Sequence, residues 1–167
     1  MSFPDTHRAR RLLAALAFSA ASLVPFAALA ETFVSERGGF AIDVPALFGE
    51  PSPSADGLSV AFSDASGEVG LTVFQWDAES GNMKSVAREI SDELKDLRTT
   101  TYQRVTSKWM VMSGYLAAET DDRVIFYERT EPLPGGKLVT MRVTWPESRR
   151  ADVDSLMKGL GASLRPL

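Results

Sequence analysis

The sequence predicts an α+β domain in which an antiparallel sheet of about six or seven strands is covered by two amphipathic helices. Three strand-like runs separated by two turns fill residues 109–145. Shorter runs that alternate apolar and polar residues, as half-buried strands do, precede them. Residues 82–97 and 147–159 instead repeat apolar residues every three or four positions, which is typical of helices that cover a sheet.

The first 30 residues have the three parts of a secretory signal peptide. Three arginines lie among residues 8–11, an apolar run follows at residues 12–24, and residues 28–30 form the small-residue cleavage motif Ala-Leu-Ala. The apolar run is shorter than the roughly 20 residues that a membrane span needs. We predict cleavage after Ala30, export to the periplasm, no membrane span after cleavage, and a single domain of residues 31–167.

Two residue types that carry much of enzyme chemistry are missing from the predicted mature chain. The sequence has no Cys, and its single His is His7, inside the signal peptide. The absence of thiol and imidazole groups excludes Ser-His-Asp and Cys-His catalysis, disulfides, His-ligated or Cys-ligated metals and a lipidated cysteine. We therefore expect no cofactor and no metal site.

The predicted mature chain is acidic. Removing three Arg and one Asp with the signal peptide from the 18 basic and 22 acidic residues leaves 15 and 21, a net charge of about −6. A negative surface repels phosphates, which argues against nucleic acid as a partner and against an anionic membrane surface.

The first half of the domain is predicted to contain four short strands. Thr32–Ser35 and Phe40–Val44 flank a Gly-Gly turn, and Pro45 ends the second run because proline lacks an amide donor. Residues 46–57, rich in Pro, Ser and Gly, are predicted as a loop. Leu58–Ser63 and Val69–Trp76 alternate apolar and polar residues around a turn and are predicted to form a hairpin.

The apolar stripe of residues 82–97 predicts an amphipathic helix, with Ser80 or Asn82 as its N-cap. This helix either covers a sheet face or binds a partner. Residues 99–107 are prone to form a strand that leads into the three-stranded meander. The second helix is predicted to begin at Glu147 and to end at Gly159 or Gly161.

The two turns of the meander predict its strand register. Centring the second loop on Pro134 and Gly135 pairs Glu128 with Met141, and centring the first on Asp121 and Asp122 places Tyr115 opposite Glu128. Both faces of the resulting sheet are partly apolar. We therefore expect a helix or a folded-back hairpin on each face.

This register suggests two candidate sites. Tyr115 and Glu128 on the more apolar face form either a general acid in a partly buried position or a structural hydrogen bond. Tyr127, Arg129 and Arg142 on the mixed face form either a place where guanidinium groups bind a carboxylate or sulfate, or a solvated polar patch.

The order of strands and helices, together with the string Phe-Ala-Ile-Asp-Val-Pro at residues 40–45, resembles the PsbP-like fold. That fold includes extrinsic photosystem subunits, a Ran-binding nuclear import factor and DcrB-type bacterial envelope proteins. Its known members are mostly noncatalytic accessory or binding proteins, so the resemblance implies a binding role. No functional motif of the family matches this sequence.

We interpret the chain as an exported, noncatalytic accessory or binding module, whose partner is an envelope protein or a small anionic ligand. One alternative is a hydrolase that uses two carboxylates, the only acid-base groups that remain. Its candidates, such as Asp64 and Glu68, lie in predicted turns, where carboxylates are common for backbone reasons. A second alternative is an inhibitor of a secreted enzyme, with residues 131–137 as the protruding loop.

Overall fold

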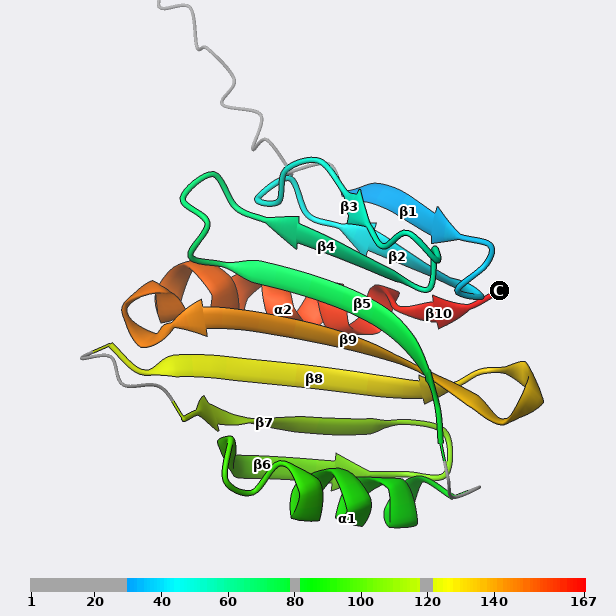
Figure 1. Ribbon diagram of the computed structural model, residues 1–167. Coiled ribbons are helices and arrows are strands. Elements are labelled where there is room, and N and C mark those ends of the chain that lie inside the picture. The colour runs from blue at the N-terminus through cyan, green and yellow to red at the C-terminus, as the bar shows by residue number, and fades with distance from the viewer. Residues whose placement is uncertain (1–29, 79–81, 118–121) are drawn as a thin grey trace, which may run out of the picture.

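The computed structural model describes residues 30–78, 82–117 and 122–167. Within these residues the chain forms a seven-stranded antiparallel sheet, a three-stranded sheet and two α-helices (Figure 1). The large sheet contains, in spatial order, β3 (Ser52–Pro53), β4 (Ser59–Ser63), β5 (Gly70–Asp77), β9 (Lys137–Pro146), β8 (Val124–Pro132), β7 (Met110–Leu116) and β6 (Arg98–Val105). The small sheet contains β1 (Glu31–Ser35), β2 (Phe40–Val44) and β10 (Arg165–Pro166). The helices are α1 (Met83–Glu93) and α2 (Arg150–Ser163). The predicted α+β class is confirmed.

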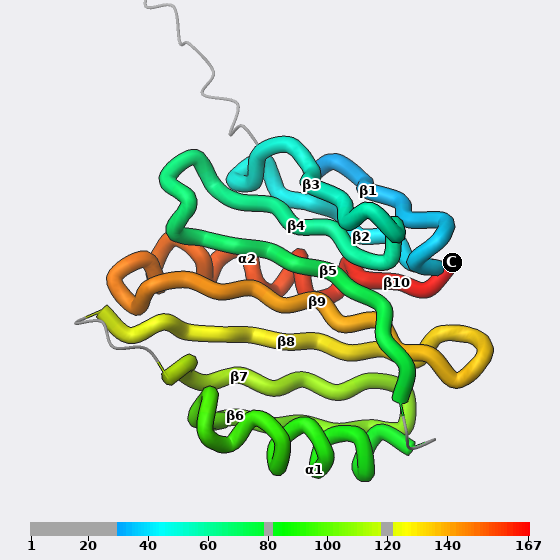
Figure 2. Tube along the Cα trace, viewed as in Figure 1, coloured from blue at the N-terminus to red at the C-terminus, as the bar shows by residue number. Residues whose placement is uncertain are grey.

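The large sheet is covered on both faces, as its two-sided apolar pattern predicted. Figure 1 and the tube in Figure 2 show α1 on one side of the sheet near β6, and α2 on the other side behind β5 and β9. The small sheet packs on the same face as α2 and forms one cluster with it. The helix of residues 82–97 therefore covers a sheet face, which was one of its two predicted roles.

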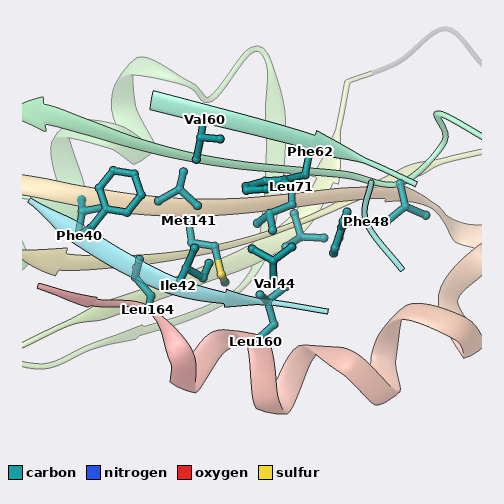
Figure 3. Close-up of a cluster of buried hydrophobic side chains, with 14 of the residues drawn as sticks. Phe40, Ile42, Val44, Phe48, Val60, Phe62, Leu71, Met141, Leu160 and Leu164 are labelled. Atoms are coloured by element: carbon teal, nitrogen blue, oxygen red, sulfur yellow. The ribbon is translucent and has the colours of Figure 1, made fainter. Parts of the chain in front are cut away.

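The main core lies between the large sheet, the small sheet and α2 (Figure 3). Phe40 and Ile42 of β2 are fully buried against Leu71 of β5 and Met141 of β9, and Leu160 of α2 closes the layer. Each such side chain contributes about 1.5–3 kcal/mol by leaving water. The alternation of apolar side chains along β2, β5 and β9 thus determines which face of the large sheet carries the small sheet and α2.

A second, smaller cluster lies beneath α1. Met83 and Val86 of the helix are buried against Met110, Met112 and Phe126 of β7 and β8. Asn82 caps the helix, since its side chain accepts a hydrogen bond from the amide of Ser85 at 2.9 Å. The second predicted cap, Ser80, lies outside the described residues.

Both predicted registers of the meander were wrong. In the structure Glu128 pairs with Arg142, one residue from the predicted Met141, because Leu133 and Lys137 close a loop that is centred on Gly135. On β7 the partner of Glu128 is Met112, and Tyr115 pairs with Ile125. Two residues of the predicted first turn, 120 and 121, lie outside the described residues. Since a shift by an odd number of residues moves every side chain to the other face, the predicted candidate sites are divided.

The ends of both helices differ from the prediction, and the second helix begins at Arg150 and not at Glu147. The helix of residues 82–97 ends at Glu93, and Leu97 is 63% exposed in the turn that leads into β6. The second helix continues through Gly159 and Gly161 to Ser163. Gly161 is a packing glycine, because a Cβ atom there would lie 2.9 Å from the hydroxyl of Tyr127.

A β-bulge in β6 explains why residue 114 of β7 is a glycine. The register between β6 and β7 shifts between Thr100 and Tyr102. This irregularity brings the backbone of Thr99 so close to Gly114 that a Cβ atom there would lie 1.9 Å from the Thr99 carbonyl oxygen. Position 114 therefore accepts glycine alone. Among the described residues, no helix is both long and apolar enough to cross a membrane.

Candidate functional site

The strongest candidate site is a groove between the C-terminal half of α1 and the large sheet, which we call the α1 groove. It has a volume of about 150 Å³. Strands β5, β8 and β9 form its floor, and one wall consists of α1 and Leu94, the residue that caps the C-terminal end of α1. Its lining residues are Phe74, Trp76, Ile90, Glu93, Leu94, Glu128, Thr130, Thr140 and Arg142. Two of them, Glu128 and Arg142, belong to the residues predicted as a site.

A triad of charges, two of them buried, lies at the base of the α1 groove. Glu128 accepts a hydrogen bond from Arg98 Nη1 at 2.7 Å through one carboxylate oxygen, and from Arg142 Nε at 2.5 Å through the other. The side chains of Arg98 and Glu128 are only 3% and 6% exposed, whereas that of Arg142 is 39% exposed. Two cations therefore share one carboxylate, and the excess positive charge is carried toward solvent by Arg142.

The guanidinium of Arg142 remains able to bind an anion. Its Nε atom contacts Glu128, and none of the hydrogen bonds found among the described residues uses its two Nη atoms. The ring of Phe74 lies beneath it, with the guanidinium carbon 5.4 Å from the ring centre. A guanidinium held by a carboxylate and an aromatic ring is fixed in orientation before a ligand arrives, which favours binding of a planar carboxylate.

The rest of the floor consists of an aromatic side chain and of polar groups that are hydrogen-bonded to one another. Trp76 donates its indole N–H to Thr140 Oγ1 at 2.9 Å, and the hydroxyls of Thr140 and Thr130 are 2.8 Å apart. Because each of these polar atoms already has a hydrogen-bond partner, an apolar ligand group that covers them leaves none of the three without a hydrogen bond. Ile90 and Leu94 add an aliphatic wall.

The structure separates Tyr127 and Arg129 from Arg142. Tyr127 and Arg129 point to the face that carries α2, while Arg142 points to the face that carries α1. Burial raises the pKa of Tyr127 above 10.0, an effect that the nearby Arg129 partly opposes. Arg129 is paired with Glu131 at 2.6 Å and lies 5.1 Å from the ring of Trp109. The predicted three-residue anion site does not form.

Tyr115 is likewise remote from Glu128. Its hydroxyl donates to Glu147 Oε1 at 3.2 Å and accepts from Arg150 Nη2 at 3.3 Å, at the start of α2. The guanidinium of Arg123 lies over its ring at 4.2 Å. The hydrogen bond from Arg123 lowers the pKa of Glu147 below 4.5. Tyr115 therefore joins β7 to the segment that begins α2, and the predicted Tyr115–Glu128 pair was wrong.

Phe74, Trp76 and Arg98 are among the residues of the α1 groove and its base that were not recognised from the sequence. Phe74 and Trp76 occupy the positions that alternate with buried Leu71 and Val73, so the pattern itself places two aromatic side chains on the opposite face. That alternation could have indicated from the sequence that Phe74 and Trp76 share a face. Arg98 carries no such signal, because it lies on β6 and reaches Glu128 of β8 across the intervening strand β7.

The alternatives to a binding role find little support in these contacts. Asp64 and Glu68 form ion pairs with Arg149 at 3.3 Å and 3.0 Å, so both carboxylates are bound to one guanidinium. The loop after β8 is anchored by Leu133, which is buried in the main core. In the described part of the chain, no cluster of three or more His, Cys, Asp or Glu is placed to hold a metal ion.

No family model and no curated protein sequence matches the chain. Solved structures do. The solution structure of PsbP from the cyanobacterium Synechocystis sp. PCC 6803 has a TM-score of 0.60 and 15% identity, and the match covers 84% of this chain and 94% of that one. The Ran-binding protein Mog1p of Saccharomyces cerevisiae has a TM-score of 0.59 and 10% identity, with coverage of 82% and 96%. A mutant of protein Mog1 matches similarly, at 0.59 and 11%.

The chain has a PsbP-like fold. The predicted resemblance is thereby confirmed. At 10–15% identity the similarity supports the arrangement of the backbone but transfers no residue role. Any function of the α1 groove therefore follows from its own residues.

Proposed function

We propose that the chain is an exported, noncatalytic binding module that docks a segment of a partner protein in the α1 groove. The segment carries an apolar side chain next to a carboxylate. The observation that carries this proposal is Arg142, whose guanidinium is oriented by Glu128 and Phe74 yet keeps its Nη atoms for a further partner. The PsbP-like neighbours support a binding role, since one of them is named as a Ran-binding protein.

The size of the groove favours a protein partner over a free small molecule. Sites for small molecules have volumes of about 300–1,000 Å³. The α1 groove, at about 150 Å³, has room for one apolar side chain. Protein interfaces use such pockets for single anchoring residues and surround them with contacts that exclude water. The exposed charge of Arg142 then selects partners with an acidic group beside the anchor.

The proposal is tested with a matched pair of probes, N-acetyl-leucine and its uncharged amide. The protein has three Trp, and Trp76 lies in the groove while Trp109 lies on the other face of the sheet and Trp145 in the main core. Their indole N–H signals in a ¹H–¹⁵N NMR spectrum therefore report on three separate places. We expect N-acetyl-leucine to shift the Trp76 signal in a saturable manner, and the amide to bind at least tenfold more weakly.

The decisive variant is Arg142→Ala, with Arg88→Ala as its control, since Arg88 is an exposed arginine of α1 outside the groove. Arg142→Ala is expected to remove the preference for the acid, whereas Arg88→Ala retains it. Equal binding of acid and amide by the unchanged protein would contradict the role given to Arg142. A response at Trp109 instead of Trp76 would place the site elsewhere.

Export by a signal peptide that is cleaved after Ala30 forms part of the same proposal. It is supported by the arginines, the apolar run and the Ala-Leu-Ala motif of residues 8–30. Mass spectrometry of the protein recovered from a periplasmic fraction is expected to show Glu31 as the first residue. Recovery of the full-length chain from the cytoplasmic fraction alone would contradict export.

A further inference from the structure

A second and larger cavity lies at the other end of the molecule, beside β1. This β1 pocket has a volume of about 470 Å³ and lies between β1, the loop of residues 45–51 and β4. Its volume falls in the range of sites for small organic molecules, about 300–1,000 Å³, and is three times that of the α1 groove. None of the predicted candidate residues lines it.

The walls of the β1 pocket are aromatic. Phe33, Phe48 and Phe62 line it, and the rings of Phe33 and Phe62 meet edge to face with centres 5.6 Å apart. Phe48 and Phe62 belong to the main core, as Figure 3 shows. Three phenyl rings supply apolar surface, and their π faces attract a cation.

The loop that forms the far wall is held by a hydrogen bond within itself and by contacts with the end of β4. Phe48 donates its backbone N–H to the Pro45 carbonyl at 3.1 Å, and Gly49 donates to the Ser63 carbonyl at 2.9 Å. A bridge between Phe48 and Asp64 holds the same loop against the end of β4. These bonds fix the loop at a distance from β1, so the pocket is formed before a ligand binds.

The charges of the β1 pocket are all of one sign. Glu31 and Glu50 line it and are exposed, and no Lys or Arg is among its lining residues. If the proposed cleavage after Ala30 occurs, the new α-amino group on Glu31 gives one positive charge against two carboxylates. A cationic ligand finds complementary charge here, whereas an anion is repelled.

We infer that the β1 pocket binds a small organic cation whose ammonium group is attached to an apolar body. The body packs among Phe33, Phe48 and Phe62, and the ammonium group lies near Glu31 and Glu50. Acid catalysis is a poorer use of the same carboxylates, because a glycosidase of this kind keeps its acid in a buried apolar position and both of these are exposed. This site is separate from the α1 groove in place and in charge preference.

The test uses three probes that share a phenyl ring and a two-carbon linker: 2-phenylethylammonium, 3-phenylpropionate and uncharged 2-phenylethanol. Each is titrated into the purified protein while the backbone amides of Phe48, Gly49 and Glu50 are followed by ¹H–¹⁵N NMR. The ammonium compound is expected to shift these amides in a saturable manner and to bind at least tenfold more tightly than the carboxylate.

The decisive variant is Glu31→Gln/Glu50→Gln, with Glu36→Gln/Glu89→Gln as a control of equal charge outside the pocket. The first is expected to weaken ammonium binding about three- to tenfold, since exposed ion pairs contribute only modestly to affinity, and to leave 2-phenylethanol unaffected. The control retains the original affinity.

Three results would overturn the inference. These are the absence of saturable shifts at the three amides, equal affinity for all three probes, and equal weakening by the pocket variant and its control. Arg142→Ala is expected to leave ammonium binding unchanged. The failure of one site is therefore distinguishable from the failure of the other.

Discussion

The charge triad beneath the α1 groove yields the sharpest prediction about stability. Among the residues that the structure describes, Arg98 forms an ion pair with Glu128 alone, and it also contacts Met112 Sδ at 3.4 Å and the ring of Phe126 at 4.6 Å. Glu128→Gln therefore leaves a cation that is 3% exposed without a counter-charge. Removal of one partner from a buried pair costs about 3–5 kcal/mol.

Arg98→Met is expected to be milder. Glu128 keeps its contact with Arg142, which reaches solvent, so the loss is that of one charge-assisted hydrogen bond, about 1.5–3 kcal/mol. The double variant Arg98→Met/Glu128→Gln removes both buried charges and lets Arg142 turn outward. We expect the double variant to be no less stable than Glu128→Gln alone, which corresponds to a coupling energy of about 2 kcal/mol or more.

Urea unfolding followed by Trp fluorescence measures these differences. With a dependence of unfolding free energy on urea of about 1.5 kcal/mol per molar, Glu128→Gln lowers the midpoint by roughly 2–3 M. The slope of the transition has to be the same in all variants for the comparison to hold. A loss below about 1 kcal/mol for Glu128→Gln, or simple additivity in the double variant, would refute the view that Arg98 depends on Glu128.

Two further predictions concern glycine and acid. Gly114→Ala is expected to lower the unfolding free energy by several kcal/mol, because its Cβ atom would lie 1.9 Å from the Thr99 carbonyl oxygen. Gly159→Ala lies in α2, where the new Cβ atom meets no neighbouring side chain or strand within 4 Å, and it is expected to raise the unfolding free energy by about 0.5–1 kcal/mol. Similar effects of both changes in urea unfolding would contradict the described bulge. Burial alone would raise the pKa of Asp64, but hydrogen bonds from the Val69 amide, Ser66 and Arg149 outweigh it and lower the pKa below 3.8, so the carboxylate stabilises the fold above that pH and its contribution disappears as the pH falls through the lowered value. Thermal unfolding between pH 2 and 7 is therefore expected to show a shallower acid loss in Asp64→Asn than in the unchanged protein, and an identical acid loss in the two would count against this account.

The fold could be predicted largely from side-chain periodicity, because alternation and helical spacing are local properties of the sequence. Asn82 was recognised as a cap and β2 by its ending at Pro45, since both signals lie within a few residues. Strand register was less accessible. The loop after β8 holds two consecutive glycines, Gly135 and Gly136. A shift of the β8–β9 pairing by one residue decides whether Glu128 and Arg142 lie on the same face.

The candidate site suffered most from that one-residue error. Arg142 and Glu128 were both singled out from the sequence, but they were assigned to different faces, and Arg142 was grouped with Tyr127 and Arg129 instead. The error was physical in origin, because a hairpin loop with glycines at positive φ tolerates more than one length of turn. The β1 pocket lay beyond sequence reasoning altogether, since it depends on how a Pro-rich loop is fastened to β4.

The two edges of the large sheet differ in their capacity to recruit further strands. β3 has two residues, one of them Pro53, so little backbone is left there for a neighbour to pair with. β6 has eight residues and ends the sheet on the other side. Its bulge between Thr100 and Tyr102 breaks the regular spacing of outward amides and carbonyls, so an added strand can match one half of β6 or the other. The backbone irregularity that demands glycine at position 114 thus also disfavours the pairing of a further strand along the whole of β6.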